Sequence, residues 1–340
     1  MNTAAKLARL LPLSCSLLLA PVILAQGPLT PPGAPAPTMK TLEQIEPRRP
    51  ISSLPAVISQ PGSYYFTKSL VFTAASGPAI SIQANDVTLD LMGFTLSSSS
   101  SVTGVGILVI STTLRNVSIR NGVIAGNTTI AATVSPAGFS VGVEGGSYFS
   151  HLRISGCRTF GLNPAEYAVI TQVNATQNGS HGISALFASI SNCSAVLNGD
   201  AGIQASSGNV SNCTASQNKG PGIFAPEGTV TNCSAISNGT VGVFAHSVAN
   251  TRAAGNGGSG IGASSGSVTN CAAQSNAGNG IDASSGTVTN STAESNGNDG
   301  IAAASGVVAF CRASSNNVNN NNSIDIDAVG ATRTGNNPTP

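Results

Sequence analysis

The 340-residue sequence has no tryptophan and few charged or aromatic side chains. Only 8% of its residues are charged and 4% are aromatic, whereas about a quarter of an ordinary globular chain is charged. Because 41% of the residues are hydrophobic, this is not the composition of a charge-driven disordered chain. The formal net charge of +1, with scattered Lys and Arg, argues against a basic nucleic-acid-binding face. Leu, Glu and Lys are scarce, which argues against a helical bundle.

The first 25 residues have the pattern of a secretory signal peptide. Lys6 and Arg9 precede a largely apolar run from Leu10 to Leu24, and Ala25 supplies a small residue at the expected cleavage site. No later segment has about 18 consecutive apolar residues, so we expect no transmembrane segment after signal cleavage. The sequence therefore predicts a secreted, periplasmic or cell-surface protein.

Changes in composition divide the remainder of the chain into three parts. Residues 26–58 are expected to be a Pro-rich linker and the lead-in to an N-terminal cap, because prolines cluster in residues 26–40. Residues 59–330 are expected to form one repetitive domain, and residues 331–340 a disordered tail.

A repeat of about 20 residues dominates the sequence from residue 142 onward. Each unit begins with a glycine followed by an aliphatic residue, and successive glycines are 18 to 21 residues apart. Repeats of this length are typical of solenoids, in which each unit buries its apolar side chains against its neighbours. The unit-starting glycines are Gly142, Gly161, Gly182, Gly202, Gly222, Gly242, Gly260, Gly280 and Gly300.

Alternation within one unit predicts a coil of three short strands. In the unit that begins at Gly202, Ile203 and Ala205 alternate with a polar residue as a short strand, residues 206–208 form a turn, and Val210 points inward again. The alternation breaks beside Asn212, a residue type that tolerates the left-handed conformation of a sharp bend. We expect these bend asparagines to point inward and to form a hydrogen-bonded ladder between coils. The set consists of Asn192, Asn212, Asn232, Asn250, Asn270 and Asn290.

With its 20-residue coil, its asparagine at the tight turn and its Gly-Ile strand start, the chain resembles the right-handed parallel β-helix proteins of the pectate-lyase-like superfamily. The resemblance covers roughly residues 60–330. It implies an all-β, single-stranded solenoid with about 20 residues per coil and roughly 12 coils. The right hand is implied by the family and by the chirality of parallel crossovers.

Five cysteines occupy one predicted inward column of the repeat. Val173, Thr251 and Ser291 take the same position in other coils, so the position needs a small inward side chain rather than a disulfide partner. We therefore expect reduced, buried thiols, although secretion permits disulfides. Cys157 occupies a loop-asparagine slot instead, and we expect it to be accessible. The column consists of Cys193, Cys213, Cys233, Cys271 and Cys311.

The outward side chains of the Gly-Ile strands are predicted to lie in one column along the solenoid. Phe224 and Phe244 are adjacent in this column, and two neighbouring exposed rings indicate a contact surface for sugar faces or a partner. The resemblance implies that such a face binds glycans. The ligand-binding candidates are Glu144, Gln204, Phe224, Phe244 and Asp282, with Asn163 and Ser184 in the same column.

Catalytic residues are not identified by the sequence. Enzymes of the superfamily act on acidic polysaccharides through clustered acids with Arg or Lys, whereas the acids here are spread over many coils. His181-Gly182 resembles the His-Gly element of polygalacturonases, but the paired aspartates of that family are absent one coil earlier. The polar cluster within residues 115–166 supplies the other candidates, which are Glu144, Arg153 and Glu166.

The sequence therefore favours a non-catalytic, monomeric protein that binds a polysaccharide or a cell-surface partner. One alternative is a polysaccharide lyase, hydrolase or epimerase acting on acidic glycans. A second is an ice-binding or adhesive surface, built on the outward Ser/Thr column that includes Ser211 and Thr231. No metal or other cofactor is expected, and calcium at Asp325 and Asp327 is kept as the alternative.

Overall fold

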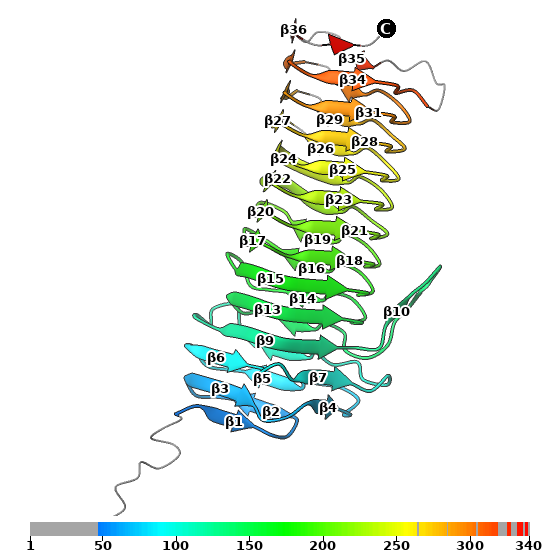
Figure 1. Ribbon diagram of the computed structural model, residues 1–340. Helices are drawn as coiled ribbons and strands as arrows, with labels where there is room; N and C mark the ends of the chain where they lie inside the picture. The colour runs from blue at the N-terminus through cyan, green and yellow to red at the C-terminus, as the bar shows by residue number, and fades with distance from the viewer. Residues whose placement is uncertain are drawn as a thin grey trace, which may run out of the picture. The chain divides into compact units, whose positions relative to one another are not determined.

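The computed structural model describes residues 47–263, 265–283, 285–303, 305–318, 325–327, 332–335 and 337–338. The expected signal peptide and most of the expected linker lie outside these residues. The described residues form one column of stacked coils (Figure 1). They contain no helix, and no helix among them is long and apolar enough to cross a membrane.

Each regular coil contributes one strand to each of three parallel sheets. The first sheet consists of β2 (Ala56–Ile58), β5 (Ile80–Ile82), β8 (Ile107–Val109), β12 (Val143–Glu144), β14 (Leu162–Asn163), β16 (Ile183–Ala185), β19 (Ile203–Ala205), the first halves of β22 (Ile223–Thr231) and β24 (Val243–Ala249), β26 (Ile261–Ala263), β29 (Ile281–Ala283), β32 (Ile301–Ala302) and β35 (Ile326–Asp327).

The second and third sheets form the other two sides of the coil. The second sheet consists of β1 (Arg49–Ile51), β3 (Gly62–Phe66), β6 (Val87–Asp90), the first halves of β9 (Ser118–Ala125), β13 (Tyr148–Ser155) and β15 (Val169–Thr176), then β17 (Ser189–Ser191), β20 (Asn209–Ser211), the ends of β22 and β24, β27 (Ser267–Thr269), β30 (Thr287–Thr289), β33 (Val307–Ala309) and β36 (Thr332–Thr334). The third consists of β4 (Leu70–Phe72), β7 (Thr95–Ser98), the second halves of β9, β13 and β15, then β18 (Ser194–Val196), β21 (Thr214–Ser216), β23 (Ser234–Ile236), β25 (Arg252–Ala254), β28 (Ala272–Gln274), β31 (Thr292–Glu294), β34 (Arg312–Ser314) and β37 (Asn337–Pro338).

The predicted β-solenoid is confirmed, with about 13 turns where the sequence predicted roughly 12. Equivalent residues pair in parallel from coil to coil, as in the alignment of Ile183 with Ile203 and of Ile203 with Ile223. The inward Ile, Val, Cys and Ala side chains form one continuous buried core. Because each coil is narrow, this core exists only through stacking.

Strand pairing extends beyond the sequence-based limits of 59 and 330 at both ends. At the N-terminal end, β1 already pairs with β3 from Arg49 onward. At the C-terminal end, β36 pairs with β33 in a segment expected to be tail. The sequence did not predict β1 because it contains Pro50, and proline is poorly compatible with a paired strand except at a sheet edge. The structure accommodates Pro50 because β1 is the edge strand of its sheet.

Two left-handed corners, not one, bend each regular coil. Asn212 has a φ of 53°, as expected for a bend asparagine, and Gln217 forms a second corner with a φ of 55°. The predicted inward direction of Asn212 is wrong, because its side chain is exposed. The alternation breaks between Ser211 and Asn212, one residue earlier than predicted, so Cys213 is the residue that points inward.

The buried ladder is formed by the other repeating asparagine, which follows the second corner. The Nδ2 group of each of these asparagines donates to the Oδ1 atom of the next at 2.8–3.0 Å. From Asn198 onward, Nδ2 also donates to a strand carbonyl at 3.1–3.2 Å, so each buried amide is fully paired. The ladder consists of Asn178, Asn198, Asn218, Asn238, Asn256, Asn276, Asn296 and Asn316.

Both ends of the asparagine ladder are closed by a different residue type. At the C-terminal end, Oδ1 of Asp325 accepts bonds from the backbone N–H and the Nδ2 group of Asn316, at 3.1 and 2.7 Å. At the other end, the backbone N–H of Cys157 donates to Asn178 Oδ1 at 3.1 Å. Cys157 is fully buried, which corrects the prediction of an accessible thiol, and burial raises its pKa to about 12.

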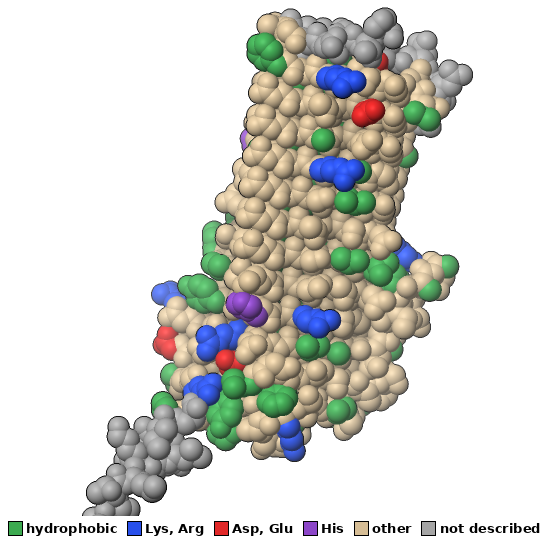
Figure 2. Space-filling model, in the orientation of Figure 1, with side chains coloured by type: hydrophobic (Ala, Val, Ile, Leu, Met, Phe, Trp, Pro, Cys, Tyr) green, Lys and Arg blue, Asp and Glu red, His purple; other side chains and the backbone are tan. Residues whose placement is uncertain are grey.

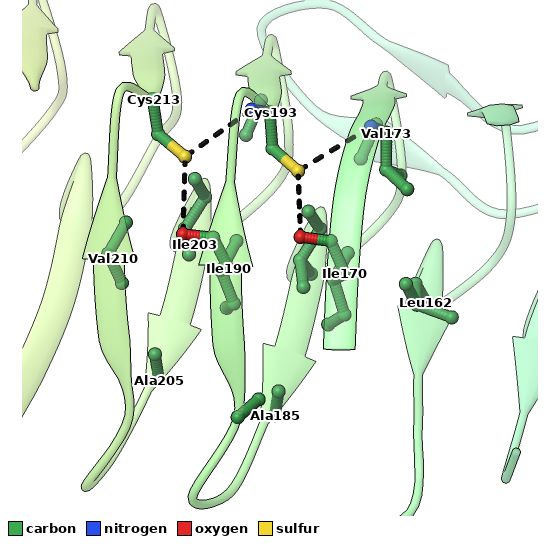
Figure 3. Close-up of a cluster of buried hydrophobic side chains, with 14 of the residues drawn as sticks. Leu162, Ile170, Val173, Ala185, Ile190, Cys193, Ile203, Ala205, Val210 and Cys213 are labelled. Atoms are coloured by element: carbon green, nitrogen blue, oxygen red, sulfur yellow. Dashed lines mark hydrogen bonds between the residues drawn. The ribbon is translucent and has the colours of Figure 1, made fainter. Parts of the chain in front are cut away.

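The cysteine column performs a similar function after the first corner (Figure 3). The backbone N–H of Cys193 donates to Cys213 Sγ at 3.4 Å, and the Cys213 thiol donates to the Ser211 carbonyl at 3.1 Å. Hydroxyl groups replace the thiol in other coils, where Cys233 N–H donates to Thr251 Oγ1. The prediction of reduced, buried thiols is confirmed for the cysteine column, because its five members are buried and form no disulfide. Cys157, the sixth cysteine among the described residues, forms no disulfide either.

One insertion departs from the coil pattern. The antiparallel hairpin of β10 (Thr129–Ile130) and β11 (Val134–Ser135) projects from the column (Figure 1). The Lys219 ammonium group donates to the Ala132 carbonyl in the hairpin turn at 2.8 Å. The hairpin therefore connects a loop of one coil to a coil several turns away along the solenoid.

The two asparagine columns give a matched test of this fold. Asn218→Ser is expected to cost about 2–4 kcal/mol, because it removes the acceptor of the buried Asn198 N–H and of one of the two Asn198 Nδ2 hydrogen bonds, together with one donor to the Ala195 carbonyl. Asn212→Ser, at an exposed corner, is expected to cost about 1 kcal/mol or less. Urea unfolding followed by circular dichroism measures both; equal losses would contradict the assignment of the ladder.

Candidate functional site

The outward side chains of the first sheet lie in one register, so the column expected from the sequence exists. Gln204 aligns with Phe224, and Phe224 with Phe244. Toward the C-terminal end, the alignment continues through Gly262 to Asp282 in the next two coils. Toward the N-terminal end, it runs through Ser184 to the strand that carries Asn163, and Asn163 in turn pairs with Glu144. We refer to this set, from Glu144 to Asp282, as the outward column.

The centre of the outward column is a pair of stacked rings. Phe224 and Phe244 lie with their centroids 5.5 Å apart and an interplanar angle of 17°, and both side chains are half-buried. Gly262 makes room for this pair, because a Cβ atom at position 262 would lie 2.7 Å from Cδ2 of Phe244. The alternation of the repeat predicted the position of the two rings, but it did not predict the glycine beside them.

A hollow lies on each side of the phenylalanine pair. The first, of about 400 Å³, is lined by Val241, Phe244, Gly258, Ser259, Gly262, Ala263 and Asp282. The second, of about 220 Å³, is lined by Asn163, Pro164, Glu166, Ser184, Ala185, Leu186, Gln204 and Ser206. We call them the Asp282 hollow and the Glu166 hollow. Together with the rings they give the outward column alternating apolar and polar surfaces.

The Asp282 carboxyl group is electrostatically unfavourable in its ionised form. Partial burial raises its pKa above the ordinary value, a hydrogen bond with Asn279 opposes the rise, and the nearby charge of Asp299 adds to it. A carboxyl group that gains a proton more easily than usual is suited to hydrogen bonding with hydroxyl groups.

The four catalytic candidates do not form one cluster. Glu144 belongs to the first sheet and Glu166 lines the Glu166 hollow, but Arg153 lies in the second half of β13, which belongs to the third sheet. His181 lies in a loop, where its ring stacks on the Phe160 ring with 5.4 Å between the ring centroids. Within the predicted polar cluster, Arg120 instead pairs with Asp90, with a distance of 3.2 Å between Nε and Oδ2.

His181 is held by its own surroundings. Its Nδ1 atom accepts the Ala201 backbone N–H at 3.2 Å, and the Asp200 carboxylate lies 3.7 Å from the same atom. Burial lowers the pKa of His181, and the Asp200 charge opposes this effect. The ring therefore packs against Phe160 and bonds to the neighbouring coil through Ala201.

Within the described residues, no three His, Cys, Asp or Glu side chains lie close enough together to hold a metal ion. Asp325, one of the two calcium candidates, accepts the hydrogen bonds of Asn316 described above. This interaction places the Asp325 carboxylate at the C-terminal end of the asparagine ladder.

Other surfaces of the column are polar and carry few charges. The side shown in Figure 2 is mostly uncharged, and its Lys and Arg side chains are widely separated along the upper part of the column. A wider groove of about 600 Å³ follows the exposed corner asparagines and includes Arg252. No aromatic side chain lines this groove among the described residues, so we place the candidate site on the first sheet.

Sequence reasoning missed a second pair of rings, Tyr167 and Phe187, beside the Glu166 hollow. Their centroids are 5.2 Å apart. Both lie in a turn after the first-sheet strand, where the repeat has Ser or Glu in the next two coils, so periodicity gave no signal for them. The unusual signal was their residue type, since large apolar residues are rare at exposed turns.

Comparisons with known proteins identify the fold. No family model matches the sequence, and no curated protein matches it. Among solved structures, the chain is similar to the A-modules of the mannuronan C-5 epimerases AlgE4 and AlgE6 from Azotobacter vinelandii. Both similarities have a TM-score of 0.53, with 13% and 15% identity over 82% of this chain and 87% and 91% of those chains.

The Dettilon tailspike protein is also similar, with a TM-score of 0.50 and 15% identity over 84% of this chain and 61% of that chain. The 340-residue chain is itself a right-handed parallel β-helix.

The burial of Asp282 predicts a pH-dependent effect of its replacement. A raised pKa in the folded state means that the ionised carboxylate costs stability above that pKa, and that the cost disappears where the group is protonated in both states. Asp282→Asn should therefore be more stable than the wild-type protein at pH 7 and equally stable below about pH 3. Thermal unfolding at the two pH values measures this.

The exposed Glu294 supplies the control, and Glu294→Gln should change stability little at either pH. A lower stability of Asp282→Asn at pH 7 would show that the folded protein favours the Asp282 carboxylate.

Proposed function

We propose that this protein is a non-catalytic polysaccharide-binding β-helix that holds a glycan chain along the outward column. The observation that carries the proposal is the Phe224–Phe244 pair between two hollows. Aromatic rings provide apolar area and a preferred geometry for the C–H faces of sugar rings. The flanking amide, hydroxyl and carboxyl groups supply the polar contacts that orient a ligand.

The similar structures support a glycan ligand through the activity of the epimerases among them. Two of them are modules of epimerases that act on mannuronan. Their identity to this chain is low, so they support the class of ligand and not the residues that bind it. A secreted, periplasmic or cell-surface location, as expected from the N-terminal sequence, agrees with such a ligand.

The same comparisons support the enzyme alternative, an epimerase, lyase or hydrolase. We favour binding without turnover because of the dispersed candidates. Glu144 and Arg153 belong to different sheets, and Nδ1 of His181 accepts a backbone N–H. Acid–base catalysis requires groups within hydrogen-bonding reach of the same substrate atoms.

Replacement of both rings tests the proposed function. The double variant Phe224→Ser/Phe244→Ser should fold, because Ser184 occupies the same column. Retention in native gels that contain a soluble polysaccharide gives the dissociation constant. This constant should rise at least about tenfold in the double variant, the effect of losing a stacked ring contact. The control is Ile236→Ser, an exposed apolar residue on the third sheet.

Unchanged retention of the double variant would contradict the site. Product formation from a polysaccharide that is abolished by Glu144→Gln or Arg153→Gln would replace the binding proposal with the enzyme alternative.

A further inference from the structure

An exposed apolar patch lies where three consecutive coils turn from the first sheet to the second. Tyr167 is 71% exposed and Phe187 is 44% exposed. Exposed apolar side chains that gather in one place usually mark a binding surface, since isolated ones are common and a cluster reduces solubility. The patch consists of Tyr148, Tyr167, Val169, Leu186 and Phe187.

The two rings at the centre of the patch are held in an unfavourable backbone conformation. Tyr167 has a φ of 60° and Phe187 a φ of 53°, values that are rare for bulky residues and strain the backbone. The register places Ser207 and Glu227 at the equivalent position of the next two coils, and their φ angles are not positive. The fold therefore does not require an aromatic residue, or a left-handed one, at this position.

The rings are arranged so that their outer faces are open. They stack with a centroid distance of 5.2 Å and an interplanar angle of 17°. Gly146 precedes Tyr167 in this column and Ser207 follows Phe187, as the register of the second-sheet strands shows. Neither neighbour has a large side chain that would cover the outer face of a ring.

The Glu166 hollow beside the patch has the chemistry of a site for hydroxyl groups. Asn163 and Gln204 supply amide donors and acceptors, and Glu166 supplies a carboxyl group next to Tyr167. In the described part of the chain, no Lys or Arg lines this hollow or the Asp282 hollow. Recognition of sugar carboxylates depends on such cations, and the carboxyl groups here would repel an anionic chain.

We propose that Tyr167 and Phe187 form a second sugar-binding platform and that the ligand of the outward column is an uncharged polysaccharide. The inference rests on the proposed function and deepens it, because it assigns a further binding site and the charge class of the ligand. The stacked rings take the apolar faces of hexose units, and the adjacent amides and the Glu166 carboxyl take their hydroxyl groups. The uronate polymers on which the similar epimerases act are thereby disfavoured.

A pair of matched variants tests the platform. Tyr167→Ser/Phe187→Ser introduces the residue that the fold already has at Ser207. Phe310→Ser is the control, because Phe310 is also an exposed aromatic residue, at 65%, and has a φ of 54°, but it lies at a corner after β33 in the second sheet. The probes are hydroxyethyl cellulose, mixed-linkage β-glucan and dextran as neutral polymers, and alginate and polygalacturonate as anionic polymers, all in native affinity gels.

We expect at least one neutral polymer to retain the wild-type protein. The dissociation constant for that polymer should rise at least about tenfold in Tyr167→Ser/Phe187→Ser. The same constant should not change in Phe310→Ser. Retention should also be insensitive to added salt, since no ion pair is involved. Retention by anionic polymers alone, lost in salt, would overturn the ligand class.

Neutral retention that survives Tyr167→Ser/Phe187→Ser but is lost in Phe224→Ser/Phe244→Ser would overturn the platform and leave the proposed function in place. Retention by none of the polymers would overturn both. A wild-type dimer that Tyr167→Ser/Phe187→Ser converts to a monomer would assign the patch to self-association and overturn the platform.

Discussion

The pairing of the backbone N–H that follows each left-handed corner is the constraint on which the regular coils depend. A left-handed residue turns the chain sharply, and the next N–H, which is buried, must find an acceptor. After the first corner, the acceptor of the Cys193 N–H is the thiol of Cys213. After the second corner, the acceptor of the Asn198 N–H is the amide oxygen of Asn218. Both acceptors are side chains of the next coil, so they tie neighbouring coils together at two edges.

This constraint explains which substitutions the repeat accepts. From Cys193 onward the first position is Cys, Thr or Ser, because each has a small group that accepts the N–H and donates to a nearby carbonyl, as Thr251 and Ser291 do. Val173, one coil earlier, has no such group, although its own N–H donates to Cys193 Sγ. The second position remains Asn along most of the column, because only a side-chain amide bridges to the next coil and to a carbonyl at once. The 18-residue spacing from Asn238 to Asn256 keeps a 3.0 Å bond, so coil length varies in the turns and not in the ladder. The distance between neighbouring coils also determines the separation of the stacked rings, which is 5.5 Å for Phe224 and Phe244 and 5.2 Å for Tyr167 and Phe187.

Periodicity predicted the fold and the outward column, but it did not distinguish two asparagines with the same period. Asn212 and Asn218 both recur every coil, and their directions depend on whether the alternation breaks before or after residue 212. The break lies before it, so the exposed corner was mistaken for the buried ladder. Periodicity also did not predict the role of Tyr167 and Phe187, because these two residues depart from the repeat instead of following it. The hollows and the space above Gly262 depend on side-chain packing, which alternation does not describe.

Hydrogen exchange at the Cys193 amide, measured in two variants of Cys213, tests whether the N–H after a left-handed corner needs a side-chain acceptor from the next coil. Cys213→Ser keeps an acceptor, as the serine at position 291 does for Cys271, and Cys213→Ala removes it. In Cys213→Ser we expect the exchange protection of the Cys193 amide to stay close to that of the wild-type protein. In Cys213→Ala we expect the protection to fall about tenfold or more, the cost of a buried N–H without a partner. Equal protection in the two variants would show that the coils do not depend on this hydrogen bond.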